Sequence, residues 1–292
     1  MTVRISRRYS TRALMADPSV AEWAQIVVAR DQQRDVLRRP GDPCPEHFWE
    51  RRAQRFARFG RLLDPDDPFL RFVQQRAGAT DTLLDVGAGT GRFALPLARQ
   101  VRQVVAVDPS PAMLAELTRA AEAAGIRNVT TVAARWEDAQ LAPAEVVLCA
   151  HVVYPIRQIG PFIEKLDAHV GRDGLLYMRV GQVDDWVAEA WEHVHGSQRL
   201  PHPDFRLLER VLEALRIPAT LELVSFTNRV TYADTDEARD DLAERLGVQP
   251  GTAEAERLDQ YLEERLLPIP DGVGLPPRPV QGAIFFWRRR SV

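Results

Sequence analysis

The sequence contains little cysteine, a single lysine and no long apolar run. Cys44 and Cys149 are the only cysteines in 292 residues, which excludes a disulfide scaffold and favours a reducing compartment. No stretch of about 18 apolar residues exists that could span a membrane. The apolar residues among positions 1–20 are too interrupted for a secretory signal. We therefore expect a soluble, cytoplasmic protein.

A net positive charge is also missing. The 38 Lys and Arg residues face 41 Asp and Glu residues, so the formal charge is −3. We therefore expect no general nucleic-acid-binding surface and no nucleic acid as partner. The charge is uneven, because residues 1–75 carry 14 arginines against 10 carboxylates. Such a segment could steer an anionic substrate, although a solvated helical surface is the simpler explanation.

The order of apolar segments indicates an α/β fold. From residue 80 onward, short apolar strands alternate with helical stretches, a pattern typical of a doubly wound, mostly parallel, Rossmann-like sheet. A long connection precedes the final strand, which we expect to be antiparallel and at the sheet edge. The predicted strands cover residues 82–86, 103–107, 128–133, 146–150, 174–180, 221–231 and 282–288.

Three parts are predicted along the chain. Residues 1–75 form a helical cap, with helix breaks at the proline-rich segments 40–43 and 64–68. Residues 76–182 form the Rossmann-like core. Residues 183–292 complete the sheet and carry substrate-facing helices, with a lid insertion at about 232–280, whose proline- and glycine-rich stretch 268–279 is predicted to be a loop.

The strongest motif is a glycine-rich turn between the first strand of the core and the next helix. Gly87, Gly89 and Gly91 permit positive φ angles and let a ligand approach the backbone. The N–H groups at the helix start favour a polar or anionic ligand. The second strand ends at Asp108, where a carboxylate can accept hydrogen bonds from two ribose hydroxyls. Asp108 could also cap the helix that begins near residue 111.

In this context the sequence resembles the class I S-adenosylmethionine-dependent methyltransferases. Residues 85–98 (DVGAGTGRFALPLA) are similar to the first motif of that superfamily, and residues 104–114 (VVAVDPSPAML) are similar to its second motif. The resemblance covers roughly residues 80–182. It implies S-adenosylmethionine as cofactor, S-adenosylhomocysteine as product, and cofactor contacts by Asp85, Gly87, Ala88, Gly89, Gly91, Asp108, Pro109, Ser110, Met113, Arg135, Trp136, Glu137 and Ala150.

One part of the expected cofactor site departs from the family pattern. Members often carry Asp-Ala or a similar pair after the third strand, which reads the adenine edge, whereas this chain has Arg135 and Trp136. Glu137 or Asp138 would then read the adenine amino group, with Trp136 packed against the ring. Plain core packing of Trp136 is the alternative.

Methyl transfer from a sulfonium is an in-line displacement that requires alignment and exclusion of water. A general base is needed only for a protonated nucleophile. His151 and Tyr154 follow the fourth strand at the level of the ligand, and we interpret them as the catalytic candidates. The motif Asn/Asp-Pro-Pro-Tyr, which marks nucleic-acid and protein amide methylation in this superfamily, is absent.

Candidate substrate contacts lie outside the core. Trp49 and Phe56, on a predicted N-terminal helix, could face the site, or could simply pack on the sheet. His195 and Arg199 could belong to a substrate wall. His193 and His195 do not predict a metal site, because side chains two positions apart on a helix diverge. We expect a monomer or homodimer.

The preferred function is methylation of a small molecule. A nicotinamide-dependent oxidoreductase is less consistent with the sequence, because its fingerprint is Gly-x-Gly-x-x-Gly rather than Gly-x-Gly-x-Gly. A nucleic-acid methyltransferase, acting on RNA for instance, has only the arginines of residues 1–75 in its favour. A non-catalytic S-adenosylmethionine-binding protein remains open, because catalysis requires little beyond alignment.

Overall fold

The computed structural model describes residues 17–37, 47–61 and 66–289. The predicted helix breaks at 40–43 and 64–65, and Cys44, lie outside these described residues. The helices are α2 (Pro18–Val36), α3 (Phe48–Arg61), α4 (Pro68–Gln74), α5 (Ala94–Ala98), α6 (Pro111–Ala123), α7 (Ile159–His169), α8 (Asp185–His195), α9 (Phe205–Ala214), α10 (Thr235–Leu246) and α11 (Ala253–Arg265).

The centre of the molecule is a seven-stranded sheet in the order β3-β2-β1-β4-β5-β10-β6. Strands β1 to β5 pair in parallel, whereas β10 runs antiparallel to both of its neighbours. The predicted Rossmann-like class is confirmed. Its strands are β1 (Thr82–Val86), β2 (Gln103–Asp108), β3 (Val129–Ala133), β4 (Ala144–Ala150), β5 (Val170–Val180), β6 (Thr220–Asn228) and β10 (Arg278–Arg288).

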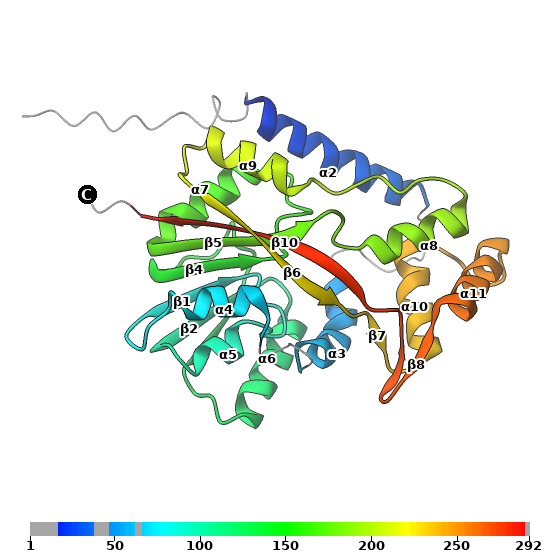
Figure 1. Ribbon diagram of the computed structural model, residues 1–292, viewed down its shortest axis with the longest axis horizontal. Helices are drawn as coiled ribbons and strands as arrows, with labels where there is room; N and C mark the ends of the chain where they lie inside the picture. The colour runs from blue at the N-terminus through cyan, green and yellow to red at the C-terminus, as the bar shows by residue number, and fades with distance from the viewer. Residues whose placement is uncertain (1–16, 38–46, 62–65, 290–292) are drawn as a thin grey trace, which may run out of the picture.

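Helices cover both faces of this sheet (Figure 1). One buried cluster joins α2, α7 and α9 to the sheet around Trp23, Phe162 and Leu208. The opposite cluster joins α4, α5 and α6 to it around Phe69 and Leu117. The strands carry apolar residues toward both faces, as expected for a parallel sheet covered on each side. This packing fixes the carboxyl ends of the strands, where ligands bind in such sheets.

The position of the final strand corrects one prediction. β10 lies between β5 and β6 rather than at the sheet edge, and β6 is the edge strand. The register places Ala283 opposite Met178 on β5 and Leu223 on β6. Two-sided pairing suits the apolar run of β10, whose Ala283, Ile284 and Phe285 are nearly inaccessible.

A third buried cluster lies beyond the carboxyl ends of the strands, on the right of Figure 1. It consists of α8, α10 and α11 together with a small sheet, and includes Val187, Leu242 and Leu258. The small sheet has the order β7-β9-β8, from Thr231–Tyr232, Gly272–Gly274 and Leu267–Ile269. Two of these strands occupy the segment that was predicted to be only a proline- and glycine-rich loop.

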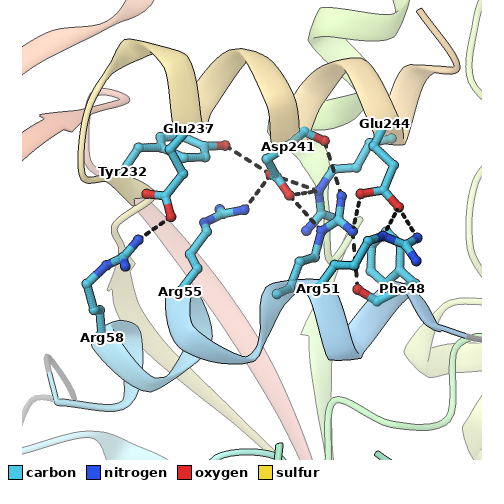
Figure 2. A network of polar contacts seen from close by, with 10 residues as sticks. Phe48, Arg51, Arg55, Arg58, Tyr232, Glu237, Asp241 and Glu244 are labelled. Carbon is cyan, nitrogen blue, oxygen red and sulfur yellow. Dashed lines mark hydrogen bonds and ion pairs between the residues drawn. The ribbon is translucent and has the colours of Figure 1, made fainter. Parts of the chain in front are cut away.

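The N-terminal helices are distributed over the molecule. α2 packs against α7 and α9, and Trp23 donates its indole N–H to the carbonyl of Ile156 at 2.9 Å. α3 lies beside α6 and faces α10 (Figure 1). Figure 2 shows arginines of α3, among them Arg55 and Arg58, pointing toward the carboxylates of α10. α3 therefore connects the core to the helical cluster.

Candidate functional site

The glycine-rich turn after β1 adopts the predicted backbone. Gly87 and Gly89 have φ angles of +77° and +53°, a region that other residues rarely adopt. A Cβ on Gly87 would lie 2.2 Å from Val152 Cγ2, so the loop after β4 closes directly on this turn. A Cβ on Gly89 would meet nothing within 4 Å. The turn is thus packed on one side and accessible on the other.

Asp108, at the end of β2, links this turn to the next one. Its Oδ2 accepts the N–H of Gly89 at 2.9 Å, and its Oδ1 accepts the N–H of Ser110 at 2.9 Å. Burial raises the pKa of Asp108, and these two N–H groups partly oppose that effect. An ionised carboxylate has about four acceptor positions, so two remain for ligand hydroxyls. The capping of α6 falls to Ser110, whose Oγ accepts the N–H of Met113 at 3.3 Å.

Asp85 lies beside Asp108 within the sheet and is only 3% exposed. Its carboxylate receives no hydrogen bond or ion pair from a described residue. Burial, and secondarily the charge of Asp108, raises the pKa of Asp85 to about 8. A buried carboxylate without a partner is costly unless a cation or donor joins it. Asp85 is therefore a position for a cationic ligand group.

Other residues predicted to contact the cofactor surround these two carboxylates. Ala88 is buried within the turn, and Ala150 is half-buried at the end of β4. Pro109 is exposed, and Met113 is buried at the start of α6. These positions lie at or shortly after the ends of β1, β2 and β4, which pair in parallel and so end at one edge of the sheet.

The segment after β3 divides between surface and core. Arg135 is largely exposed, with its Nε 4.0 Å from Glu137 Oε2. Trp136 is buried, and its indole N–H donates to the carbonyl of Phe162 on α7 at 3.2 Å. These contacts support the packing interpretation of Trp136 rather than the stacking of its ring on adenine. Arg135 and Glu137 remain predicted adenine contacts.

His151 follows β4 in an unusual backbone conformation, with a φ angle of +60°. Its N–H donates to the carbonyl of Tyr177 at 2.8 Å. Its Nδ1 lies 3.2 Å from the hydroxyl of Tyr154, and that hydroxyl accepts the N–H of Arg179 at 2.7 Å. The hydroxyl can donate its hydrogen to His151 Nδ1, and its second lone pair can equally accept a hydrogen from Nδ1, so both neutral tautomers of His151 fit this contact.

The charge state of His151 follows from the same surroundings. Burial, followed by the positive charges of Arg92 and Arg179, lowers the pKa of His151 to about 3. The imidazole is therefore neutral near pH 7 and carries one hydrogen on its ring nitrogens. The role of His151 as a general base stays a prediction, and so does a catalytic role for Tyr154. Burial raises the pKa of the Tyr154 phenol, which keeps it protonated.

Three further residues at this edge were missed in the sequence. Arg92 directly follows the glycine turn, while Tyr177 and Arg179 belong to β5. The Tyr177 ring lies 4.7 Å from the His151 ring between centroids. In the sequence, Tyr177 and Arg179 belong to a strand read only as apolar, without a motif. One signal for the site was present in the sequence, because Arg179 is a charged residue near the carboxyl end of its strand, where ligands bind in such sheets.

The predicted substrate residues on α3 lie at the surface of that helix. The Trp49 ring is 42% exposed and packs edge-on against Phe48 and Phe56, with centroid separations of 5.0 and 5.1 Å. Phe56 is half-buried. The role of both rings toward substrate remains a prediction.

His195 and Arg199 have internal partners. His195 Nε2 lies 2.9 Å from the carbonyl of Leu246, and its ring packs on Trp191 with centroids 4.6 Å apart. Arg199 pairs with the buried carboxylate of Asp184, which also binds Arg30 at 3.0 Å. These contacts hold α8 and the loop after it in place. They do not support a substrate wall built from these two side chains.

The described residues contain no group of three or more His, Cys, Asp or Glu side chains arranged to hold a metal ion. Within the same ranges, none of the helices combines the length and apolarity needed to cross a bilayer. A surface hollow of about 790 Å³ lies between α2 and α9, and its lining includes no residue of the glycine turn. The chemistry described above therefore rests on the loops after β1, β2 and β4 and the end of β5.

Comparison with known proteins agrees with this geometry. A sequence model described as a methyltransferase domain matches residues 83–174. Residues 83–174 are thus similar to a methyltransferase domain, and the strand order is that of a Rossmann-like fold.

The individual relatives match this chain over only part of its length. The sequence is 48% identical over 127 residues to the 23S rRNA (uracil(1939)-C(5))-methyltransferase RlmD of Aeromonas hydrophila, over 38% of this chain and 29% of that protein. The chain spans less than half the length of the curated relatives that it matches.

Two solved structures have a similar fold. The YcgJ protein of Bacillus subtilis superposes with a TM-score of 0.51 at 14% identity, over 76% of this chain and 98% of that one. A candidate methyltransferase from Bacillus halodurans superposes with a TM-score of 0.52 at 16% identity, over 76% and 99%.

Proposed function

We propose that this chain transfers the methyl group of S-adenosylmethionine to a small-molecule acceptor. The observation that carries the proposal is the presence of two neighbouring buried carboxylates at the strand ends. Asp108 accepts N–H groups from two loops, whereas the carboxylate of Asp85 has no described partner. S-adenosylmethionine has ribose hydroxyls for the first and an ammonium group for the second. The accessible side of Gly89 gives the ligand direct access to the backbone.

In this proposal the bound cofactor supplies an activated methyl group, and the protein supplies alignment. Gly87, Gly89 and Gly91 hold the ligand close to the backbone, Asp108 accepts two hydroxyl hydrogens, and Asp85 holds the ammonium. His151, which is neutral, contacts the acceptor molecule. The helical cluster of α8, α10 and α11 limits the access of water to the strand ends.

An RNA substrate is the second candidate, because one relative is named as an rRNA methyltransferase. That match covers 38% of this chain, and the net charge of −3 gives no overall attraction to phosphate. A non-catalytic protein that binds S-adenosylmethionine would share the same loops. We favour the small-molecule acceptor, and we propose a monomer or homodimer in the cytoplasm.

The test is calorimetric titration with S-adenosylhomocysteine, with NAD as the control ligand. We expect micromolar affinity for the first ligand and no binding of the second. Asp108→Ala should weaken S-adenosylhomocysteine binding by about 1.5–3 kcal/mol, because bonds from two hydroxyls to a charged acceptor are lost. Asp108→Asn, which keeps one oxygen, should lose less.

Asp259→Ala, which removes a half-buried carboxylate paired with Arg239 between α10 and α11, serves as the matched control and should bind like the wild type. Equal affinity of Asp108→Ala and the wild type, with both proteins folded, would disprove the ribose role. Detection of a methylated product in an extract supplied with labelled S-adenosylmethionine separates an enzyme from a binding protein.

A further inference from the structure

Two buried donors on β5 have no hydrogen-bond partner among the residues that the structure describes. They are the hydroxyl of Tyr177 and the Nε–H of Arg179. The residues are 2% and 5% exposed. Because they lie two positions apart on one strand, their side chains leave the same face of the sheet. Buried donors normally have acceptors, so this pair requires an explanation.

Other donors gather around this pair. Arg92 Nη2 lies 3.5 Å from Asp67 Oδ2, and Arg179 Nη2 lies 3.6 Å from Asp185 Oδ2. Both separations are too long for a good hydrogen bond, so the guanidinium groups keep donors available. The neutral imidazole of His151 lies against Tyr177, with ring centroids 4.7 Å apart. A group surrounded by these side chains must accept hydrogen bonds.

The walls of this region are aromatic. Tyr177 stacks on Phe69, with ring centroids 4.4 Å apart and planes 5° apart. The Arg179 guanidinium lies over the ring of Phe226, 5.5 Å from its centroid. A Cβ on Gly282 would lie 2.5 Å from the Tyr177 hydroxyl oxygen, so glycine leaves the space that this ring occupies. Aromatic walls around cationic donors suit a ligand that has an apolar body and an anionic end.

We propose that Tyr177 and Arg179, with Arg92 at the entrance, bind a carboxylate group of the methyl acceptor. This inference rests on the proposed function, and it names the acceptor as a small carboxylic acid. The two donors match the two oxygens of a carboxylate. The site adjoins the cofactor loops, because Arg92 follows Gly91 and because Val152, beside His151, contacts Gly87.

Access to the two donors requires a movement, since both atoms are enclosed in this structure. Arg92 is the residue best placed to make it, because its side chain is 43% exposed, lies 3.5 Å from Asp67 Oδ2, and otherwise packs over the ring of Phe93, 5.3 Å from its centroid. Its charge acts on His151, Tyr177 and Arg179 alike. An entering carboxylate would draw the Arg92 guanidinium toward itself and release Asp67.

The test uses full-length protein with ¹⁵N-labelled arginine, saturated with S-adenosylhomocysteine, and formate as the smallest carboxylate probe. Formamide is the neutral control of the same size. The Arg179 Nε–H resonance is assigned by its loss in Arg179→Lys, and Arg239, on the exposed face of α10, provides the reference resonance. We expect a saturable shift of the Arg179 signal with formate and none with formamide.

Tyr177→Phe should weaken formate binding about tenfold, because one donor to a charged acceptor is lost. Its affinity for S-adenosylhomocysteine should not change. If formate gives no saturable shift while S-adenosylhomocysteine binds, the carboxylate site is wrong and the proposed function stands. If formate and formamide shift the signal alike, the site does not select a carboxylate. Failure to bind S-adenosylhomocysteine would overturn both proposals.

Discussion

At the scale of single residues, the site contrasts two tyrosines, Tyr154 in the loop after β4 and Tyr177 on the neighbouring strand β5. The hydroxyl of Tyr154 accepts a backbone N–H and reaches His151, whereas the hydroxyl of Tyr177 has no described partner. The same chemical group therefore contributes differently to stability at the two positions. A hydrogen bond that is made contributes modestly, while a buried group left unsatisfied is costly.

The substitution Tyr→Phe distinguishes these two situations. Tyr154→Phe leaves the buried N–H of Arg179 without its acceptor and should lower the free energy of unfolding by about 1–3 kcal/mol. Tyr177→Phe removes a hydroxyl that has no described partner and should leave stability unchanged or slightly higher. Urea unfolding without ligand measures both. A loss in Tyr177→Phe equal to that in Tyr154→Phe would contradict the assignment.

Asp85 gives the protein a characteristic dependence on pH. Its folded-state pKa of about 8 lies above its ordinary value of 3.8, so the folded protein retains a proton that the unfolded chain has released. Between about pH 4 and pH 8 stability should therefore fall as pH rises, by at most about 1.4 kcal/mol per pH unit from this group. Asp85→Asn should remove this dependence and be more stable than the wild type at pH 8.

The ligand should reverse the ionisation of Asp85. An ammonium group beside this carboxylate favours its charged form, so binding of S-adenosylhomocysteine near pH 7 should release a proton. Calorimetry in buffers with different ionisation enthalpies detects that release, which Asp85→Asn should lack. A binding enthalpy independent of buffer in the wild type would exclude this role.

The sequence indicated the conformation of the glycine turn, but not the place of Tyr177 and Arg179 beside it. Gly87, Gly89 and Asp108 lie in a short local motif, and their roles depend on backbone conformation that neighbouring residues determine. Tyr177 and Arg179 reach the other residues of the site only because β5 pairs with β4 and β10. These pairings join segments that are far apart in the sequence. A tyrosine in an apolar strand is typical of ordinary core packing.

At the scale of elements, the contact between α3 and α10 is built around one buried carboxylate. Asp241 receives Arg52 Nε at 2.7 Å, Arg55 Nη1 at 2.5 Å and Arg245 Nε at 2.9 Å (Figure 2). Burial would raise the pKa of Asp241, but the three arginine charges lower it below its usual range. Arg58 and Glu237 form a more exposed pair between the same helices.

Asp241→Asn should lower the free energy of unfolding by about 3–5 kcal/mol, because three guanidinium groups lose a buried counter-charge. Glu237→Gln makes the same chemical change in the exposed pair and should cost less than about 1 kcal/mol. Urea denaturation of the two variants gives the comparison. Similar losses would mean that the connection between the helices does not depend on buried charge.

Strand order is where prediction from the sequence failed at this scale. The seven strands of the main sheet were located by their apolar residues, but the place of β10 between β5 and β6 depends on pairing across residues 229–277. A strand buried on both faces has no periodic pattern that distinguishes the centre from the edge. The short strands β8 and β9 were missed because proline and glycine are typical of loops.

At the scale of the whole molecule, the net charge bears on the choice between a small-molecule substrate and an RNA substrate. The net charge is −3, and the excess of arginine over carboxylate is confined to residues 1–75. We expect no saturable binding of an RNA oligonucleotide at about 150 mM salt, measured by fluorescence anisotropy. If binding is found, a plot of the logarithm of the association constant against the logarithm of the salt concentration should have a slope of about −0.7 for each phosphate contacted. A steep slope would favour an RNA substrate.

The place of β10 also determines the order in which the chain can complete its fold during synthesis. The strands β1 to β5 leave the ribosome as a contiguous parallel unit, and domains commonly begin to fold from their N-terminal side. β6 then emerges with no strand beside it and must wait, through residues 229–277, for β10 to be translated. During that interval both β5 and β6 expose unpaired edges, which are prone to aggregation. A translational pause in this segment would therefore prolong the nascent chain's dependence on chaperones.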